Sequence, residues 1–169
     1  MHSSAKPFDL SAVAGAGLGG LAGPLDMGVP PDAATFERNL AALGPKNRAL
    51  AEALRRAPAR AGLRFERGQD GLLTGTLDGR RLSSARRGAE EAERFAETVD
   101  FTDAAVACVM GFGLGHHLRA LHERMGEKSA IVCFEPDLGL LRAVLERVDH
   151  SAWLGRNRCV IATDADDAA

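Results

Sequence analysis

The feature that most constrains the fold of this chain is an alternation of short apolar runs with helical stretches in its C-terminal part. The apolar runs are residues 104–110, 130–134 and 159–162. After the first run, Leu114, Leu118 and Leu121 keep spacings of four and three, which is typical of one helix face. Because parallel neighbouring strands need a crossover connection, usually a helix, the pattern predicts a right-handed Rossmann-like βαβαβ unit with parallel strands over residues 102–169.

The preceding segment, residues 32–101, begins with a helical pattern. Apolar residues between positions 36 and 54 recur at helical spacing, and Gly44 and Pro45 interrupt them. Glycine suits the end of one helix and proline the first turn of the next, so a helical hairpin or a bent helix is expected rather than one straight helix. Together with the strands described next, this predicts an α/β fold class: a helical hairpin and small β-meander followed by a partial Rossmann-like unit.

Three short runs with strand-like composition follow the hairpin. The dipeptides Asp70-Gly71 and Asp78-Gly79 separate them and tolerate the positive φ angles of tight turns, so the runs predict a β-meander. A helix over about residues 85–99 is expected to end the segment. Its expected buried residues are Ala92, Phe95, Ala96 and Val99. Further along the chain, Trp153 is expected to be a core residue.

The first 31 residues differ from the rest of the chain in composition. Residues 10–25 are apolar, but they consist mainly of alanine and glycine rather than leucine, and only Lys6 precedes them as a basic residue. This composition disfavours a signal peptide. Glycines and prolines break the segment, so residues 1–31 are expected to form a flexible Gly/Ala/Pro-rich extension.

Charge and cysteine content exclude several classes of protein. With a net charge of −2 and a pI near 6.2, the chain has no global attraction for phosphate backbones, so no nucleic-acid partner is expected. No window approaches the roughly 18 apolar residues that span a bilayer, so no membrane span is expected. Cys108, Cys133 and Cys159 show no CxxC spacing and are expected to be small buried residues in the reducing cytoplasm.

The candidate binding site lies where the first predicted strand meets its helix. In a parallel α/β unit, ligands bind beyond the carboxyl ends of the strands, where glycines allow close approach to the backbone. Gly111, Gly113 and Gly115 occupy that place, and Glu135, at the end of the second strand, could accept hydrogen bonds from a ribose. The pattern predicts a nucleotide or S-adenosylmethionine site. The alternative is a purely structural turn, because His116 stands where the dinucleotide fingerprint has glycine or alanine.

Three histidines follow the glycines. His116 and His117 begin the predicted helix and His122 lies later on it, a spacing that puts no pair at i, i+4 and disfavours a metal site. His116 or His117 could contact an anionic ligand or act as an acid or base. The alternative is that both are partly exposed residues of the first helical turn. No catalytic residue and no specific cofactor follow from these patterns.

Several segments in succession resemble the N-terminal region of one protein family. They are Phe36-Glu37-Arg38-Asn39-Leu40-Ala41-Ala42-Leu43, Leu50-Ala51-Glu52-Ala53-Leu54, Leu82-Ser83-Ser84, Gly111-Phe112-Gly113-Leu114-Gly115-His116-His117-Leu118 and Val132-Cys133-Phe134-Glu135-Pro136-Asp137. Their order and spacing resemble the motility accessory factor (Maf) family of bacterial flagellin glycosyltransferases, which is similar to the 6-hydroxymethylpterin diphosphokinase MptE-like group. The resemblance extends from about residue 33 to the C-terminus.

The resemblance implies a function in flagellin glycosylation. The family transfers a nonulosonic acid sugar from a CMP donor to flagellin, in a domain that follows the N-terminal one. For this chain it implies a non-catalytic module whose partner is flagellin or another acceptor protein. It supplies no catalytic residue here, and only Gly111, Gly113, Gly115 and Glu135 map to a ligand-lining edge.

Two alternatives to this function remain open. One is an S-adenosylmethionine-dependent methyltransferase or another nucleotide-binding domain, and the other is a non-enzymatic interaction domain. Three short parallel strands also leave a sheet edge unpaired, because doubly wound sheets usually have about five or six strands. The unit over residues 102–169 is therefore expected to be truncated, or to be completed by strands from the meander or from a partner chain. The oligomeric state stays undetermined.

Overall fold

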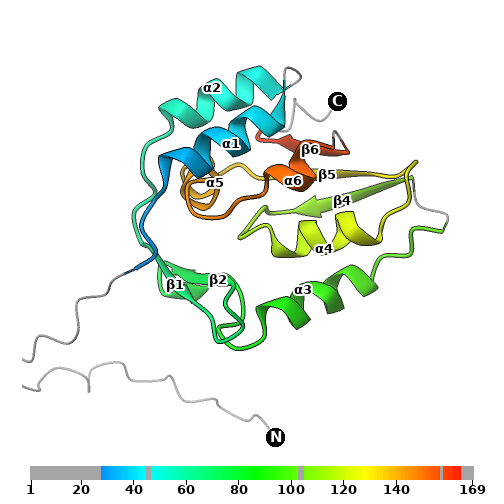
Figure 1. The fold of residues 1–169 in the computed structure, drawn as a ribbon, viewed down its shortest axis with the longest axis horizontal. Coiled ribbons are helices and arrows are strands. Elements are labelled where there is room, and N and C mark those ends of the chain that lie inside the picture. The colour runs from blue at the N-terminus through cyan, green and yellow to red at the C-terminus, as the bar shows by residue number, and fades with distance from the viewer. Residues whose placement is uncertain (1–27, 45–46, 103–104, 157, 165–169) are drawn as a thin grey trace, which may run out of the picture.

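The structure is a computed structural model that describes residues 28–44, 47–102, 105–156 and 158–164. Within these residues the chain has the predicted α/β fold: N-terminal helices, an antiparallel sheet and then a parallel sheet that alternates with helices (Figure 1). Residues 1–27, most of the predicted flexible extension, lie outside the described residues. No described helix is long and apolar enough to cross a membrane.

The predicted helical hairpin is confirmed as α1 (Ala33–Leu43) and α2 (Arg48–Arg56). The carboxylate of Asp32 accepts hydrogen bonds from the backbone N–H groups of Ala34 and Thr35, both at 3.1 Å, and so caps α1. Gly44 ends this helix with a φ of 69°, a left-handed conformation that favours glycine.

The predicted β-meander is confirmed as β1 (Leu63–Arg67), β2 (Leu73–Leu77) and β3 (Arg80–Arg81), which pair antiparallel in that order. Asp78 and Gly79, between β2 and β3, have φ angles of 51° and 78°, as a tight two-residue hairpin turn requires. The meander forms a sheet of its own and therefore does not extend the parallel sheet, which excludes one of the two expected ways of completing that sheet.

The third predicted helix is α3 (Gly88–Glu97), and its burial differs from expectation at two positions. Ala92 and Ala96 are buried as predicted, but Phe95 is 40% exposed and Val99 is only partly buried. The small alanines allow α3 to pack closely on α4 (His116–Arg124) (Figure 1). The ring of Phe95 lies beside this contact and packs edge-on against His117 at 5.2 Å between ring centroids.

The C-terminal part is the predicted parallel βαβαβ unit. Its strands β4 (Val106–Met110), β5 (Ala130–Phe134) and β6 (Cys159–Ala162) pair parallel in that order. Helix α4 connects the first two strands, and α5 (Leu138–Leu145) and the short α6 (Ser151–Leu154) connect the last two. Because the strand order follows the chain, right-handed crossovers place these helices on one face of the sheet.

The buried core lies between that sheet face and the helices. Ile131 and Cys133 are fully buried there, and Trp153 on α6 is a core residue as predicted. Cys108 was expected to be buried like the other two cysteines and is exposed instead. Side chains alternate along a strand, so Cys108 points to the opposite face of the sheet, which carries no crossover helix.

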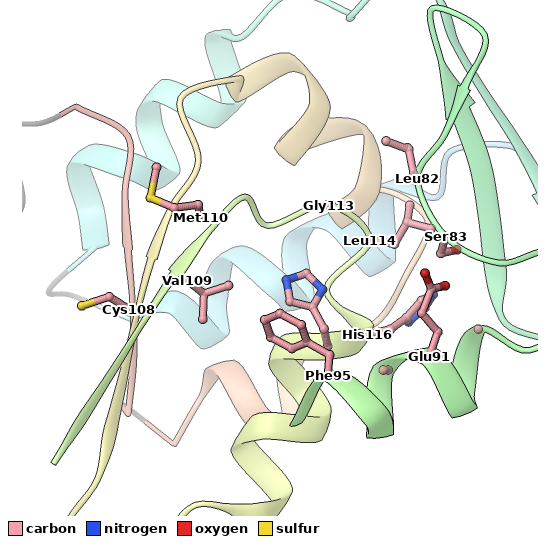
Figure 2. Close-up of a pocket in the computed structure, with 13 residues that line it drawn as sticks. Leu82, Ser83, Glu91, Phe95, Cys108, Val109, Met110, Gly113, Leu114 and His116 are labelled. Atoms are coloured by element: carbon pink, nitrogen blue, oxygen red, sulfur yellow. The ribbon is translucent and has the colours of Figure 1, made fainter. Parts of the chain in front are cut away.

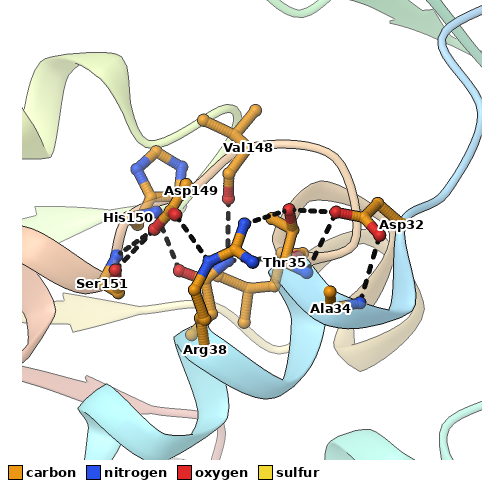
Figure 3. A network of polar contacts seen from close by, with 10 residues as sticks. Asp32, Ala34, Thr35, Arg38, Val148, Asp149, His150 and Ser151 are labelled. Carbon is orange, nitrogen blue, oxygen red and sulfur yellow. Dashed lines mark hydrogen bonds and ion pairs between the residues drawn. The ribbon is translucent and has the colours of Figure 1, made fainter.

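A polar network fastens the helical hairpin to the parallel unit (Figure 3). Asn39 of α1 is fully buried, and its amide nitrogen donates to the backbone carbonyls of Leu145 at 2.8 Å and Val148 at 2.7 Å. Its side-chain oxygen accepts the backbone N–H of His150 at 2.8 Å. The three bonds satisfy carbonyl and amide groups at and after the end of α5. A single hydrophobic core also includes residues from both parts of the chain.

Candidate functional site

The candidate site begins at the glycine turn between β4 and α4, defined as residues 111–115. The N–H of Gly111 donates to the carbonyl of Phe134 at 2.8 Å, so the turn starts where the sheet pairing ends. Gly111, Gly113 and Gly115 have φ angles of 88°, 49° and 77°. Each angle is in the left-handed region, which explains locally why the sequence has glycine at all three positions.

The three glycines differ in what surrounds them. A Cβ atom on Gly115 would lie 2.6 Å from Nε2 of His150, so this glycine is also required by packing. A Cβ atom on Gly111 would meet nothing within 4 Å, and one on Gly113 would meet only His117, at 3.7 Å. The backbone at Gly111 and Gly113 is therefore open to the approach of a ligand, whereas Gly115 faces the protein interior.

Glu135 lies at the glycine turn, as its position in the sequence predicts, and it is 5% exposed. One carboxylate oxygen accepts the backbone N–H of Phe112 at 2.9 Å, and the other accepts the N–H of Asp137 at 2.9 Å. The side chain thus joins the end of β5 to the glycine turn. Each oxygen keeps one further lone pair, but the expected contact with a ribose would have to share the carboxylate with these two amides.

A cavity of about 420 Å³ lies beside the glycine turn, between α3, β4 and the start of α4 (Figure 2). Its walls are mostly apolar and include Phe95 and Met110. Gly113, Glu91 and His117 place polar groups at the same cavity. An apolar cavity with a few polar groups is typical of small-molecule sites.

Both histidines at the start of α4 are engaged with backbone carbonyls. Nε2 of His116 lies 2.8 Å from the carbonyl of Leu73, and Nε2 of His117 lies 3.2 Å from that of Gly111. Since a carbonyl only accepts, each Nε2 carries the hydrogen, and Nδ1 of a neutral ring is left as an acceptor. Burial lowers the pKa of His117, so this ring is neutral at physiological pH. These contacts favour the alternative that both histidines are partly exposed residues of the first helical turn over the alternative that they contact an anionic ligand.

His150 packs against the glycine turn from the protein interior. The sequence analysis did not identify it as a residue of the site. It is 1% exposed, with Nε2 3.2 Å from the carbonyl of Leu114 and Nδ1 3.1 Å from the indole N–H of Trp153. Nδ1 therefore accepts and Nε2 donates, which defines the neutral tautomer. Burial lowers the pKa of His150 to about 3. Only its spacing of three from Trp153 signals this pair in the sequence.

His122 is also buried, at 3% exposure, and neither ring nitrogen has a hydrogen-bond partner. Its ring lies 6.1 Å from that of Trp153, and burial lowers its pKa. Within the described ranges, no group of three or more His, Cys, Asp or Glu side chains is placed to hold a metal ion.

Comparison with known proteins identifies a structural relative. The chain matches no protein-family model and no curated protein. It is structurally similar to the MAf glycosyltransferase from Magnetospirillum magneticum AMB-1, with a TM-score of 0.59 and 20% sequence identity over 79% of this chain. The match spans 28% of that glycosyltransferase chain. The described fold therefore resembles that of one part of this glycosyltransferase.

Proposed function

We propose that this chain is a Maf-like domain that acts in the cytoplasm as a non-catalytic module in flagellin glycosylation. The observation that carries the proposal is the structural match to a MAf glycosyltransferase over 79% of this chain. The resemblance of residues 111–118 and 132–137 to the N-terminal region of the Maf family supports it independently. In this proposal another domain transfers the nonulosonic acid sugar, and this one contributes to assembly or to presentation of the acceptor.

The contacts at the glycine turn support a non-catalytic role. Glu135 bonds two backbone amides, and His116 and His117 bond backbone carbonyls. General acid–base catalysis needs a group that is free to take or give a proton within reach of a substrate. Each of these three side chains is held by a structural contact, which leaves only Nδ1 of each histidine and the second lone pairs of the Glu135 oxygens for such a role.

Deletion of the gene from its source cells tests the proposal. We expect the intact mass of flagellin, measured by mass spectrometry, to fall by the mass of its nonulosonic acid sugars. Re-expression of the full chain should restore that mass. The matched control is the Leu121→Asp variant, because Leu121 is fully buried and a carboxylate there should prevent folding and hence restoration. An unchanged flagellin mass after deletion would overturn the proposal.

A second candidate function is binding of a nucleotide or S-adenosylmethionine, favoured by the cavity beside Gly113. Calorimetric titration should then show saturable binding that is lost in Gly113→Val and Glu135→Ala. Gly71→Val is the matched control, since Gly71 also has a positive φ, 80°, with open space around its Cβ position, but it lies in the meander. Binding that survives in both site variants would sink this candidate.

A further inference from the structure

Strand β4 is an edge strand of the parallel sheet. It pairs with β5 on one side, and no other strand of the described residues pairs with it on the other side. The carbonyl of Ala105 and the N–H of Gly111 are each hydrogen-bonded to β5, at 2.9 Å and 2.8 Å. Successive residues of a strand point in opposite directions, so the odd-numbered residues from 105 to 111 direct their backbone groups at β5. Cys108 and Met110 therefore direct their backbone N–H and C=O groups at the open edge.

This edge is available for pairing with another strand. Within the described ranges, no hydrogen bond from outside the sheet reaches the backbone groups of Cys108 or Met110. Unpaired edges are templates for further strands, and proteins usually block them with proline, lysine or a bulge. Strand β4 has the sequence Val-Ala-Cys-Val-Met, and its register with β5 is continuous, so it contains none of these three.

The cavity of about 420 Å³ beside the glycine turn runs along this edge (Figure 2). Three successive residues of β4 line it, Cys108, Val109 and Met110. Val109 faces the core, whereas Cys108 and Met110 are exposed on the opposite face of the sheet. Since successive side chains point to opposite faces, a cavity that touches all three lies at the edge of the strand. Glu91 and Phe95 of α3 form the opposite wall, and we call the space between α3 and β4 the edge groove.

The polar side chains of the edge groove favour a positively charged occupant. Glu91 supplies a carboxylate, one oxygen of which accepts the backbone N–H of Ser84 at 2.6 Å. The ring of His117 is neutral and keeps Nδ1 as an acceptor. Among the described residues, no lysine or arginine lines the groove, and the ring of Phe95 offers a cation a favourable surface. A lysine side chain, with its apolar stem and charged end, complements these walls.

We propose that the edge groove binds an extended segment of another protein, which pairs with β4 as an added strand and places a lysine side chain in the cavity. In strand addition, main-chain hydrogen bonds provide affinity and side-chain pockets provide specificity. Pairing with β4 of a second copy would not supply the lysine, because residues 106–110 carry no basic side chain. The inference is independent of the proposed function, since it depends only on β4, α3 and the cavity between them.

A short synthetic peptide tests strand addition directly. The probe is the amidated peptide Thr-Val-Lys-Val-Thr with an N-terminal fluorescein, titrated with the full chain and followed by fluorescence anisotropy. We expect saturable binding. Only alternate N–H groups of an added strand face β4, so methylation of the lysine nitrogen in the main chain and methylation of both valine nitrogens should differ. One of the two methylated peptides should lose binding and the other should keep it.

Two variants of the chain test the two walls of the edge groove. Cys108→Pro removes an N–H that points out of the sheet, a change that edge strands tolerate, and it should abolish binding of the peptide. Cys108→Ser retains the N–H and should bind like the wild type. Glu91→Gln should weaken binding about two- to fivefold, the contribution of an exposed ion pair. Its matched control is Glu93→Gln, which is also exposed on α3 but lies outside the groove and should leave binding unchanged.

Each outcome of these experiments decides the proposal. Absence of saturable peptide binding, or equal effects of the two methylations, would overturn it. Binding of ATP or S-adenosylmethionine without binding of the peptide would overturn it in favour of the second candidate function. Self-association that Cys108→Pro abolishes would also overturn it, because a second copy would then occupy the edge. If circular dichroism shows that Cys108→Pro is unfolded, the methylated peptides and the Glu91→Gln variant decide instead.

Discussion

At the scale of single residues, His150 couples folding to pH. Burial lowers its pKa from 6.5 to about 3 in the folded chain. As pH falls below 6.5, the imidazole of His150 therefore becomes protonated in the unfolded chain but stays neutral in the folded chain. The free energy of unfolding then decreases by up to about 1.4 kcal/mol per pH unit. Urea unfolding monitored by the fluorescence of Trp153, the sole tryptophan, should show this loss between about pH 6 and pH 4.

The His150→Gln variant is the control for this dependence. Glutamine retains hydrogen-bonding capacity near Leu114 and Trp153 but does not titrate. The variant should be less stable at neutral pH, and its stability should fall less steeply with decreasing pH. Burial also lowers the pKa of His117 and of His122, so a smaller slope of the same sign should persist. Parallel pH profiles for the two proteins would contradict this role of His150.

At the scale of elements, the glycine turn contains glycine for two different reasons: Gly111 needs only a left-handed backbone conformation, and Gly115 also needs space beside His150. Gly111→Ala should cost only the left-handed backbone conformation, about 1–2 kcal/mol, because a Cβ there meets no other atom within 4 Å. Gly115→Ala adds overpacking against Nε2 of His150, 2.6 Å away, for a total of about 2–4 kcal/mol. Urea denaturation midpoints of the two variants measure the difference, and equal losses would contradict the close approach of Gly115 to His150.

At the scale of the whole molecule, Asn39 is a fully buried polar link between the helical hairpin and the parallel unit. Asn39→Ala leaves the carbonyls of Leu145 and Val148 without this donor, which should cost about 2–4 kcal/mol. Because one hydrophobic core includes both parts, we expect a single unfolding transition. Far-ultraviolet circular dichroism and Trp153 fluorescence should therefore coincide. Earlier loss of helical signal would show that residues 32–101 unfold separately.

Local sequence signals predicted most of the fold. Gly44 ends α1, Asp78 and Gly79 form the tight turn, and the three apolar runs became parallel strands. The candidate site was predicted only in its location: the glycines and Glu135 meet at one turn, while binding of a ligand there stays a prediction. The hydrogen bonds of Glu135 to Phe112 and Asp137 were not predictable, because they depend on how the end of β5 meets the turn.

The sequence by itself determined the elements and their order, because turns, helix ends and strand runs depend on interactions between residues close along the chain. Only the tertiary structure decided which side chains are buried. Cys108 lies in an apolar run yet is exposed, and Phe95 follows the helical pattern yet lies at a cavity rim. His150 became the buried support of a turn 35 residues earlier, at Gly115. A side chain is buried when another element covers the face on which it lies. Which two faces pack together depends on several segments at once, so no single segment of the sequence encodes it.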